Sequence, residues 1–266
     1  MAKGLALVSG ASSGIGFELA ELFAGDGYDL VVAADEDSIE SCADKLRGAG
    51  VDVRAVQVDL RKPEDVDRLY NIAIEDGRTL QAAALDAGSG RAGSFIDGDM
   101  DDDLGIIDLN VRSTVQLAKL VLVDMARQGS GKVLFTSSIV AGMPGWNQSM
   151  YNASKSFVQS FAEALHDELR DTGVTVTSLM PSPSATDFFR RAGMSDTLLA
   201  RMPKDDPARV ARQGYESLMS GDRKVLAASL FSKAMGVTNW LLPDAVKSAA
   251  NRLIVTRTGS RRKEFG

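Results

Sequence analysis

A tyrosine and a lysine four positions apart are the residues of this chain best placed to do chemistry. Tyr151 and Lys155 stand in the segment Tyr-Asn-Ala-Ser-Lys at the start of a helical pattern, so both side chains lie on one face of the helix. An ammonium beside a phenol favours the phenolate, which otherwise forms only near pH ~10. Ser138, at the end of a buried-strand pattern upstream, adds a hydroxyl that can hold a carbonyl or alcohol oxygen. Together the three side chains predict proton transfer to oxygen.

A glycine-rich segment near the amino terminus predicts a phosphate-binding loop. The run Ser-Gly-Ala-Ser-Ser-Gly-Ile-Gly, residues 9–16, follows the first strand pattern and opens the first helical pattern. Gly10 permits a tight turn, Gly14 lets the backbone approach a pyrophosphate, and Gly16 lets helix pack closely on strand. The helix amino terminus supplies amides for the phosphates, whereas the alternative is an ordinary flexible loop. The remaining cofactor contacts expected in this loop are Ser12, Ser13 and Ile15.

Acidic residues follow the second and third strand patterns. The run Asp35-Glu36-Asp37 comes where a dinucleotide fold reads the ribose, and a carboxylate there accepts from a 2′-hydroxyl and repels a 2′-phosphate. We therefore expect NAD(H) to be favoured over NADP(H), with Asp35 as the reader, while Glu36 and Asp37 fit a solvated turn nearly as well. Asp59 either accepts from an adenine amino group or caps the helix that begins near Pro63.

The elements that position these residues alternate along the whole chain. Short Val, Leu and Ala runs are separated by helical patterns, and residues 30–34 are apolar on both alternating faces, as in a parallel sheet covered on both sides. We predict an α/β fold in one domain, residues 1–266, with a doubly wound, seven-stranded parallel sheet and helices on both faces. The expected strands are 5–9, 30–34, 51–58, 80–86, 132–137, 174–180 and 224–228, and the expected helices are 14–25, 38–47, 63–76, 101–127, 150–172 and 207–219.

Composition excludes several classes of protein. The formal charge of −6 and a pI near 5.0 argue against a nucleic-acid partner. Cys42 is the only cysteine, which rules out an intramolecular disulfide and a cysteine-rich zinc site, so we expect no metal centre and a structural thiol in a reducing compartment. His166, the only histidine, is expected on a solvated helix face. Because no signal peptide or bilayer-length apolar run is evident, we expect a cytoplasmic protein.

Three peripheral features carry less specific predictions. Residues 184–206 are expected to form a substrate lid, or else a surface excursion. The extension 230–266 is expected to be a docked helix with a frayed end, with a partner-binding helix or a loose membrane-surface contact as alternatives. An apolar pocket wall is expected to favour a hydrophobic ketone or alcohol, unless the aromatic residues serve only to pack the lid; it consists of residues 142–146, Met180, Phe188 and Phe189.

In their order along the chain, the glycine loop, Asn110, Ser138 and Tyr151-x-x-x-Lys155 resemble the short-chain dehydrogenase/reductase family. The resemblance spans residues 5 to about 186 and implies a Rossmann-type fold that binds NAD(H) or NADP(H). It also implies roles: Tyr151 is the general acid or base, Ser138 holds the reacting oxygen, and Lys155 lowers the pKa of Tyr151 and binds the nicotinamide ribose. In the same comparison Asn110 distorts its helix locally and anchors a water in the proton relay.

The resemblance adds cofactor contacts and shows departures from the family pattern. Thr186 stands where the family binds the nicotinamide carboxamide. Asp86 replaces an asparagine, so it keeps an acceptor, loses an amide donor and brings a carboxylate near the cofactor. Ser182 replaces a glycine after the sixth strand, which predicts a stiffer wall, and Ser9 replaces a threonine with little consequence. The other implied contacts are Leu60, Ala87, Gly88 and Pro181.

We expect an oxidoreductase that passes hydride between nicotinamide and a carbonyl or alcohol carbon. A non-catalytic dinucleotide sensor or interaction protein is the alternative, which Asp86 and Ser182 keep open. A sugar-nucleotide epimerase or dehydratase is a third possibility, although those chains usually carry a larger carboxy-terminal substrate domain. The resemblance further implies a homodimer or homotetramer formed through the helices at 101–127 and 150–172.

Overall fold

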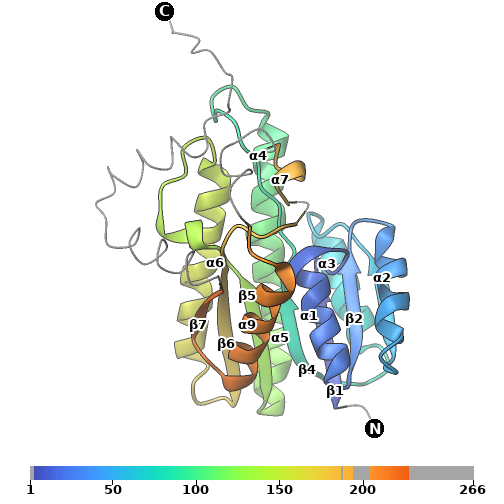
Figure 1. The fold of residues 1–266 in the computed structure, drawn as a ribbon. Helices are drawn as coiled ribbons and strands as arrows, with labels where there is room; N and C mark the ends of the chain where they lie inside the picture. The colour runs from blue at the N-terminus through green and yellow to red at the C-terminus, as the bar shows by residue number, and fades with distance from the viewer. Residues whose placement is uncertain (1–2, 187, 194–203, 228–266) are drawn as a thin grey trace, which may run out of the picture.

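In the part of the chain that the structure describes, seven parallel strands form one sheet at the centre, as predicted (Figure 1). The computed structural model describes residues 3–186, 188–193 and 204–227. The strand order is β3-β2-β1-β4-β5-β6-β7. The strands are β1 (Gly4–Ser9), β2 (Tyr28–Ala34), β3 (Val53–Gln57), β4 (Leu80–Leu85), β5 (Gly131–Thr136), β6 (Val174–Pro181) and β7 (Lys224–Ala227).

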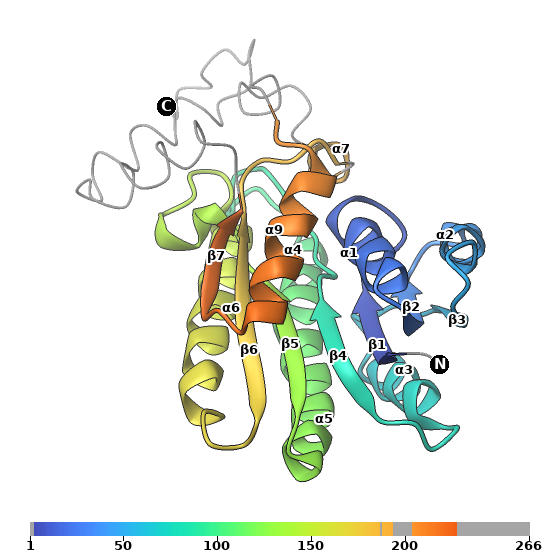
Figure 2. The same cartoon turned by 60° about the horizontal axis from the view of Figure 1, so that its bottom comes forward.

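Helices cover both faces of the sheet, which confirms the doubly wound prediction (Figure 2). One face carries α1 (Gly14–Gly25), α2 (Ser38–Arg47) and α9 (Pro207–Ser220). The opposite face carries α3 (Pro63–Ile74), α5 (Ser113–Gln128) and α6 (Ser149–Glu168). Two short helices, α4 (Met100–Ile107) and α7 (Phe188–Arg191), a π-helical turn, Asp108–Arg112, and a 3-10 turn, Ile139–Gly142, complete the described elements.

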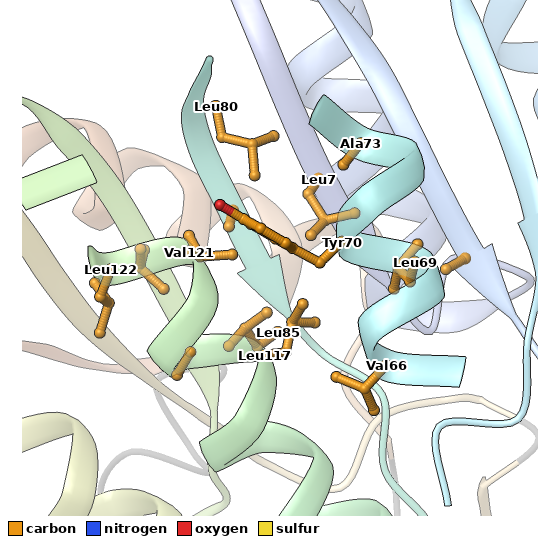
Figure 3. Close-up of a cluster of buried hydrophobic side chains, with 14 of the residues drawn as sticks. Leu7, Val66, Leu69, Tyr70, Ala73, Leu80, Leu85, Leu117, Val121 and Leu122 are labelled. Carbon is orange, nitrogen blue, oxygen red and sulfur yellow. The ribbon is translucent and has the colours of Figure 1, made fainter. Parts of the chain in front are cut away.

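Successive apolar residues of a strand point alternately to the two faces of the sheet. In β1, Leu5 and Leu7 face the layer of α3, α5 and α6, whereas Ala6 and Val8 face the layer of α1, α2 and α9. Figure 3 shows the first layer, where Leu7 lies among side chains from α3, β4 and α5. Both faces of strands such as β1 and β2 are buried, so these strands read as nearly continuous apolar runs rather than alternating ones.

The long helix expected at 101–127 is interrupted. The chain forms α4, then a π-helical turn over Asp108–Arg112, then α5. One extra residue in such a turn redirects the side chains at its centre without breaking the apolar stripe on either side. The hydrophobic periodicity therefore predicted one continuous helix, and the resemblance alone indicated the local distortion at Asn110.

The strand order places a crevice between β1 and β4. From β1 the chain moves outward to β2 and β3, then returns to β4 on the other side of β1 and continues to β7. The segments that follow β1 and β4 therefore diverge at the carboxyl edge of the sheet, where ligands bind in open α/β folds. The loop after β4 meets the segment after β6 at this edge, since Ala92 N donates to Ala192 O at 3.0 Å.

The peripheral predictions have mixed outcomes. His166 does not lie on a solvated face: it is half-buried on α6, with Nδ1 2.7 Å from the carbonyl oxygen of Val176 in β6. Cys42 is buried on α2, as the structural interpretation required, and its thiol donates to Ser12 O. The extension at 230–266 lies outside the described residues. None of the helices that the structure describes is long and apolar enough to cross a membrane.

Candidate active site

A cavity of about 300 Å³ opens at the carboxyl edge of the sheet and gathers nearly all of the predicted site residues. It runs from the glycine loop to the amino-terminal turns of α6. Of the residues expected to bind cofactor or act in catalysis, only Gly16 and Asn110 are absent from its lining. The predicted members present are Gly10, Ser12, Ser13, Gly14, Ile15, Asp35, Asp59, Leu60, Ala87, Gly88, Ser138, Tyr151, Lys155, Pro181 and Thr186.

The glycine loop has the shape of a cradle that side chains would fill. Gly10 has φ +75°, and a Cβ built on it would lie 2.9 Å from the backbone N and Cα of Ala87. Gly14 has φ +60°, and its Cβ would meet Thr186 Cγ2 at 2.8 Å. Gly16 was expected to let the helix pack closely on the strand. The contact that a side chain there would break lies within the loop itself, since a Cβ built on Gly16 would lie 2.3 Å from Gly10 O. The bare backbone leaves the amino terminus of α1 open to a phosphate.

The Ser9 hydroxyl ties the glycine loop to the end of β4. Its oxygen accepts from the backbone amides of Asp86 and Ala87, each at 3.2 Å. The replacement of threonine by serine at this position therefore keeps the bond that joins the two strand ends, in agreement with the prediction of little consequence.

The side chains that are predicted to be catalytic approach the cavity from the end of β5 and from α6. Ser138 follows β5 and begins the 3-10 turn, where its hydroxyl accepts from Val140 N at 3.3 Å. The same hydroxyl hydrogen-bonds the Tyr151 phenol. Lys155 is 6% exposed, and its Nζ donates to the Thr136 carbonyl oxygen at 2.8 Å. The predicted serine, tyrosine and lysine are thus brought together on one wall.

Burial has the largest effect on the ionisation of this group. Burial raises the pKa of Tyr151 to about 12, the hydrogen bond from Ser138 opposes the rise, and the charge of Asp86 adds to it. Burial lowers the pKa of Lys155 to about 8, against the opposing effect of Asp86. The pKa of Tyr151 therefore lies above its ordinary value, and the effect expected of Lys155 on this phenol stays a prediction.

Asn110 lies behind the cavity wall rather than in it. It is 1% exposed at the centre of the π-helical turn. Its Oδ1 accepts from Ser89 N at 2.9 Å, and its Nδ2 donates to Ser89 O at 2.8 Å and to Ser154 Oγ at 2.9 Å. The amide therefore fixes the loop after β4 against α6. A Cβ built on Gly88 would lie 3.1 Å from Lys155 Nζ and 3.3 Å from Asn110 Oδ1, so the asparagine stands close to the ammonium.

At the opposite end of the cavity, acidic residues meet two arginines. Asp35 is exposed at the end of β2. The Asp59 carboxylate accepts from Arg61 N at 3.1 Å and Arg61 Nε at 2.8 Å, and this pairing holds the pKa of Asp59 below its usual range. Lys62, not Asp59, is the N-cap of α3, so the interpretation of Asp59 as a helix cap is wrong.

Arg191 is a cavity residue that sequence reasoning missed. Its guanidinium pairs with Glu36 at 3.1 Å and donates to Ser13 Oγ at 2.9 Å. The contact joins α7 to the glycine loop and to the acidic run after β2. No local signal marks it, because the three residues come from segments far apart in the chain.

The apolar wall is only partly as predicted. Phe188 lines the cavity, and its ring lies 5.0 Å from that of Tyr151, centroid to centroid. Met180 and residues 142–146 are not part of the lining. Ile139, Val140 and Gln148 line the cavity instead. The side chain of Phe189 lies outside the described part of the structure.

The donor set fits a nicotinamide dinucleotide. A cradle of bare backbone at a helix amino terminus suits a pyrophosphate, an exposed carboxylate after β2 suits a ribose hydroxyl, and a buried ammonium lies beside the phenol at the far end. Fold and cavity together define an oxidoreductase class that uses such a cofactor. Among the described residues, no cluster of metal-ligating side chains is present.

The chain belongs to the short-chain dehydrogenase family, whose model matches residues 4–196. It is 30% identical over 208 residues to the oxidoreductase UcpA of Salmonella typhimurium, covering 77% of this chain and 76% of the relative. It is 31% identical over 188 residues to dehydrogenase/reductase SDR family member 4 of Bos taurus, covering 70% and 67%. The protein is therefore a short-chain dehydrogenase/reductase with a nicotinamide cofactor.

Solved structures give the same result. A short-chain dehydrogenase from Sphingobium yanoikuyae, in complex with NADPH, superposes with a TM-score of 0.78 at 28% identity, covering 88% of this chain and 93% of that one. A short-chain dehydrogenase/reductase from Burkholderia phymatum, in complex with NAD, gives a TM-score of 0.82 at 22% identity over 99% of both chains and shows the shared fold.

Proposed function

We propose that the protein transfers hydride between a nicotinamide and the carbon of a hydrophobic ketone or secondary alcohol, with Tyr151 as the general acid or base. The observation that carries the proposal is the placement of Ser138, Tyr151 and Lys155 on one wall of the cavity whose other end is the glycine loop. When bound, the cofactor supplies the hydride chemistry. The residues of the chain supply the binding, the orientation and the proton.

In reduction, the carbonyl carbon takes the hydride and its two electrons, and the oxygen takes the Tyr151 proton. The Ser138 hydroxyl, which is hydrogen-bonded to that phenol, holds the carbonyl oxygen within reach of the Tyr151 hydroxyl. The phenolate formed is stabilised by the Lys155 ammonium and regains its proton through it, with a water at Asn110 as the next member of the relay. Alcohol oxidation runs the same steps in reverse, with the Tyr151 phenolate as base.

The substrate end of the cavity supports an apolar ligand. Phe188 lies against Tyr151, and Ile139 and Val140 contribute aliphatic surface beside Ser138. Gln148 also lines the cavity, and apolar surface combined with a small number of polar groups is typical of sites for small ligands. We also propose that the segment 184–206 acts as a lid, since its residue Phe188 lines the cavity; residues 187 and 194–203 of this segment lie outside the described part of the structure.

We propose NAD(H) as the preferred cofactor. Asp35 lines the adenosine end of the cavity, exposed and able to accept from a ribose 2′-hydroxyl. The two arginines at this end, Arg61 and Arg191, are already paired with Asp59 and Glu36, which leaves less positive charge to receive a 2′-phosphate.

Assembly and location are proposed on separate observations. The helices expected to form subunit contacts present exposed apolar side chains: Leu104 on α4 is 50% exposed and Phe157 on α6 is 41% exposed. They support a homodimer or homotetramer, which light scattering on the purified protein would measure. The single cysteine is compatible with the cytoplasmic location that we propose.

The proposal is tested by titrating the protein with NADH and with NADPH while following nicotinamide fluorescence, then adding a panel of hydrophobic ketones. We expect binding of NADH and ketone-dependent loss of absorbance from the reduced cofactor. Binding without turnover across the panel would favour a dinucleotide sensor on the same fold. Failure to bind either cofactor would contradict the proposal at its first step.

A further inference from the structure

We propose that Asp86 is the counter-charge of Lys155: its carboxylate, linked to the ammonium through Thr136, keeps the catalytic group electrically neutral and sets the pH at which Tyr151 gives up its proton. The effect on catalysis rests on the proposed function, in which Tyr151 is the general acid or base. The arrangement of Asp86 and Lys155 does not depend on that function.

Thr136 links the two charged groups through its hydroxyl and its carbonyl oxygen. Its hydroxyl donates to Asp86 Oδ1 at 2.6 Å, and its carbonyl oxygen accepts from Lys155 Nζ at 2.8 Å. Thr136 is the last residue of β5, and Asp86 follows the end of the neighbouring strand β4. The adjacent strand ends therefore fix the carboxylate and the ammonium on either side of one residue.

Burial is the largest influence on Asp86 and raises the pKa of its carboxyl. The Thr136 hydroxyl, the charge of Lys155 and the backbone amide of Gly16 act in the opposite direction and favour the ionised form. Asp86 also lines the cavity rather than the protein core, so solvent reaches it and limits the penalty of burial.

An asparagine cannot reproduce this arrangement. Its single oxygen would accept from one of the two donors, Gly16 N–H or the Thr136 hydroxyl, and its amide would face the other. The Thr136 hydroxyl can turn to accept from the amide, so the hydrogen bonds survive in reversed polarity. The charge does not survive, and the change from asparagine to Asp86 is therefore mainly electrostatic.

The charge of Asp86 affects the titration of two side chains of α6, Tyr151 and Lys155. Asp86 opposes the loss of a proton from Lys155 and from Tyr151. Within the described part of the chain, the hydrogen-bond partners of Asp86 from other elements are neutral groups: Thr136 from β5, the Gly16 amide from α1 and the Ser9 hydroxyl from β1. With these pKa values Lys155 loses its proton before Tyr151 does. With Asp86 ionised, the Tyr151 proton then leaves a group of net charge −1, whereas without Asp86 it leaves a group of zero net charge, which takes place at lower pH.

The test is a tyrosinate titration, which needs neither substrate nor cofactor. The near-ultraviolet absorbance of wild type and of Asp86→Asn is followed against pH, with each protein paired with its Tyr151→Phe derivative so that the other three of the 4 tyrosines are subtracted. We expect the Tyr151 signal of Asp86→Asn to appear at a pH lower by about one unit or more, the usual effect of one nearby charge.

Ser9→Ala is the matched control. It removes the hydroxyl that accepts from the Asp86 and Ala87 amides, which loosens the same backbone, but it leaves the carboxylate in place. We expect its Tyr151 signal to coincide with wild type. Should Asp86→Asn not fold, Asp86→Ser removes the same charge and keeps a hydroxyl for the Thr136 and Gly16 contacts.

An unchanged or higher titration pH without Asp86, or an equal shift in Ser9→Ala, would overturn the proposal, because the carboxyl would then be neutral or merely structural. Cofactor binding is measured on the same samples. Failure to bind NADH would contradict the proposed function and leave the charge pairing to be decided by the titration alone.

Discussion

At the phosphate end of the cavity the wall is backbone, whereas at the catalytic end it is a set of partly or fully buried ionisable side chains. Gly10 and Gly14 adopt positive φ and leave no room for a Cβ, so we expect the glycine loop to recognise the cofactor by shape and by its amides. At the other end, Asp86 raises the pKa values of Tyr151 and Lys155, and Lys155 acts to lower that of Asp86. The first end depends on close packing and the second on the balance of charge.

Substitutions should therefore have different consequences at the two ends. A change in the glycine loop is expected to reduce the free energy of unfolding together with cofactor binding. A change in the charged group is expected to alter turnover and pH dependence while the fold persists. Each of the following variants either sharpens this contrast or breaks it.

The largest effect is expected from Lys155→Met. The ammonium that stabilises the Tyr151 phenolate is lost, so turnover should fall by about a thousandfold, within the usual range for a group in acid-base catalysis. Ketone-dependent NADH oxidation measures it, and circular dichroism reports the fold. Lys119→Met, which removes an exposed lysine from α5, is the control and should retain wild-type turnover. Equal rates in both variants would remove Lys155 from the catalytic group.

The next effect is expected from Gly10→Ala compared with Gly27→Ala. Both glycines have positive φ, +75° and +84°, so both variants lose about 1 kcal/mol of stability or somewhat more from backbone strain. Nothing lies within 4 Å of a Cβ on Gly27, whereas one on Gly10 lies 2.9 Å from the backbone of Ala87. Gly10→Ala should therefore be the less stable by a further ~1 kcal/mol or more, with NADH binding reduced about tenfold or more.

Urea unfolding and NADH titration measure this pair. Equal stability and equal affinity in the two alanine variants would mean that the close approach of the glycine loop to Ala87 has no consequence. Loss of stability without loss of NADH affinity in Gly10→Ala would separate the loop from the cofactor.

The smallest effect is expected from Asp35→Arg. Replacing a carboxylate by a guanidinium at the adenosine end removes the acceptor for a 2′-hydroxyl and adds a partner for a 2′-phosphate. The ratio of NADPH to NADH affinity should rise about tenfold, the equivalent of ~1.4 kcal/mol. Fluorescence titration with both cofactors measures the ratio. A constant ratio would assign the reading of the ribose to another residue, with Arg191 the first to examine.

The same contrast explains how much of the molecule could be predicted from the sequence. The glycine loop is contiguous, and strand, loop and helix each leave a local pattern, so its position and backbone conformation followed from residues 5–25. All seven strands and both helical layers followed from periodicity in the same way. The Ser138, Tyr151 and Lys155 group was found because its members stand on predicted elements in a recognisable order.

The electrostatics of the catalytic end could not be predicted in that way. Because Lys155 and Tyr151 share one helix face, a lowered pKa was expected for the phenol. Burial and the charge of Asp86, which follows β4, raise that pKa instead. The contact of Arg191 with Glu36 and Ser13 likewise joins three distant segments. The π-helical turn at Asn110 was invisible to periodicity, because the apolar stripe continues on both sides of it.

The most direct test of the account compares wild type with Tyr151→Phe for NADH binding and for ketone-dependent oxidation of bound NADH in a single turnover. The variant removes only the hydroxyl and keeps the ring that lies against Phe188. The account predicts unchanged NADH affinity within about twofold and a rate reduced by about a thousandfold or more. Hydride transfer at the wild-type rate without the Tyr151 hydroxyl would contradict it.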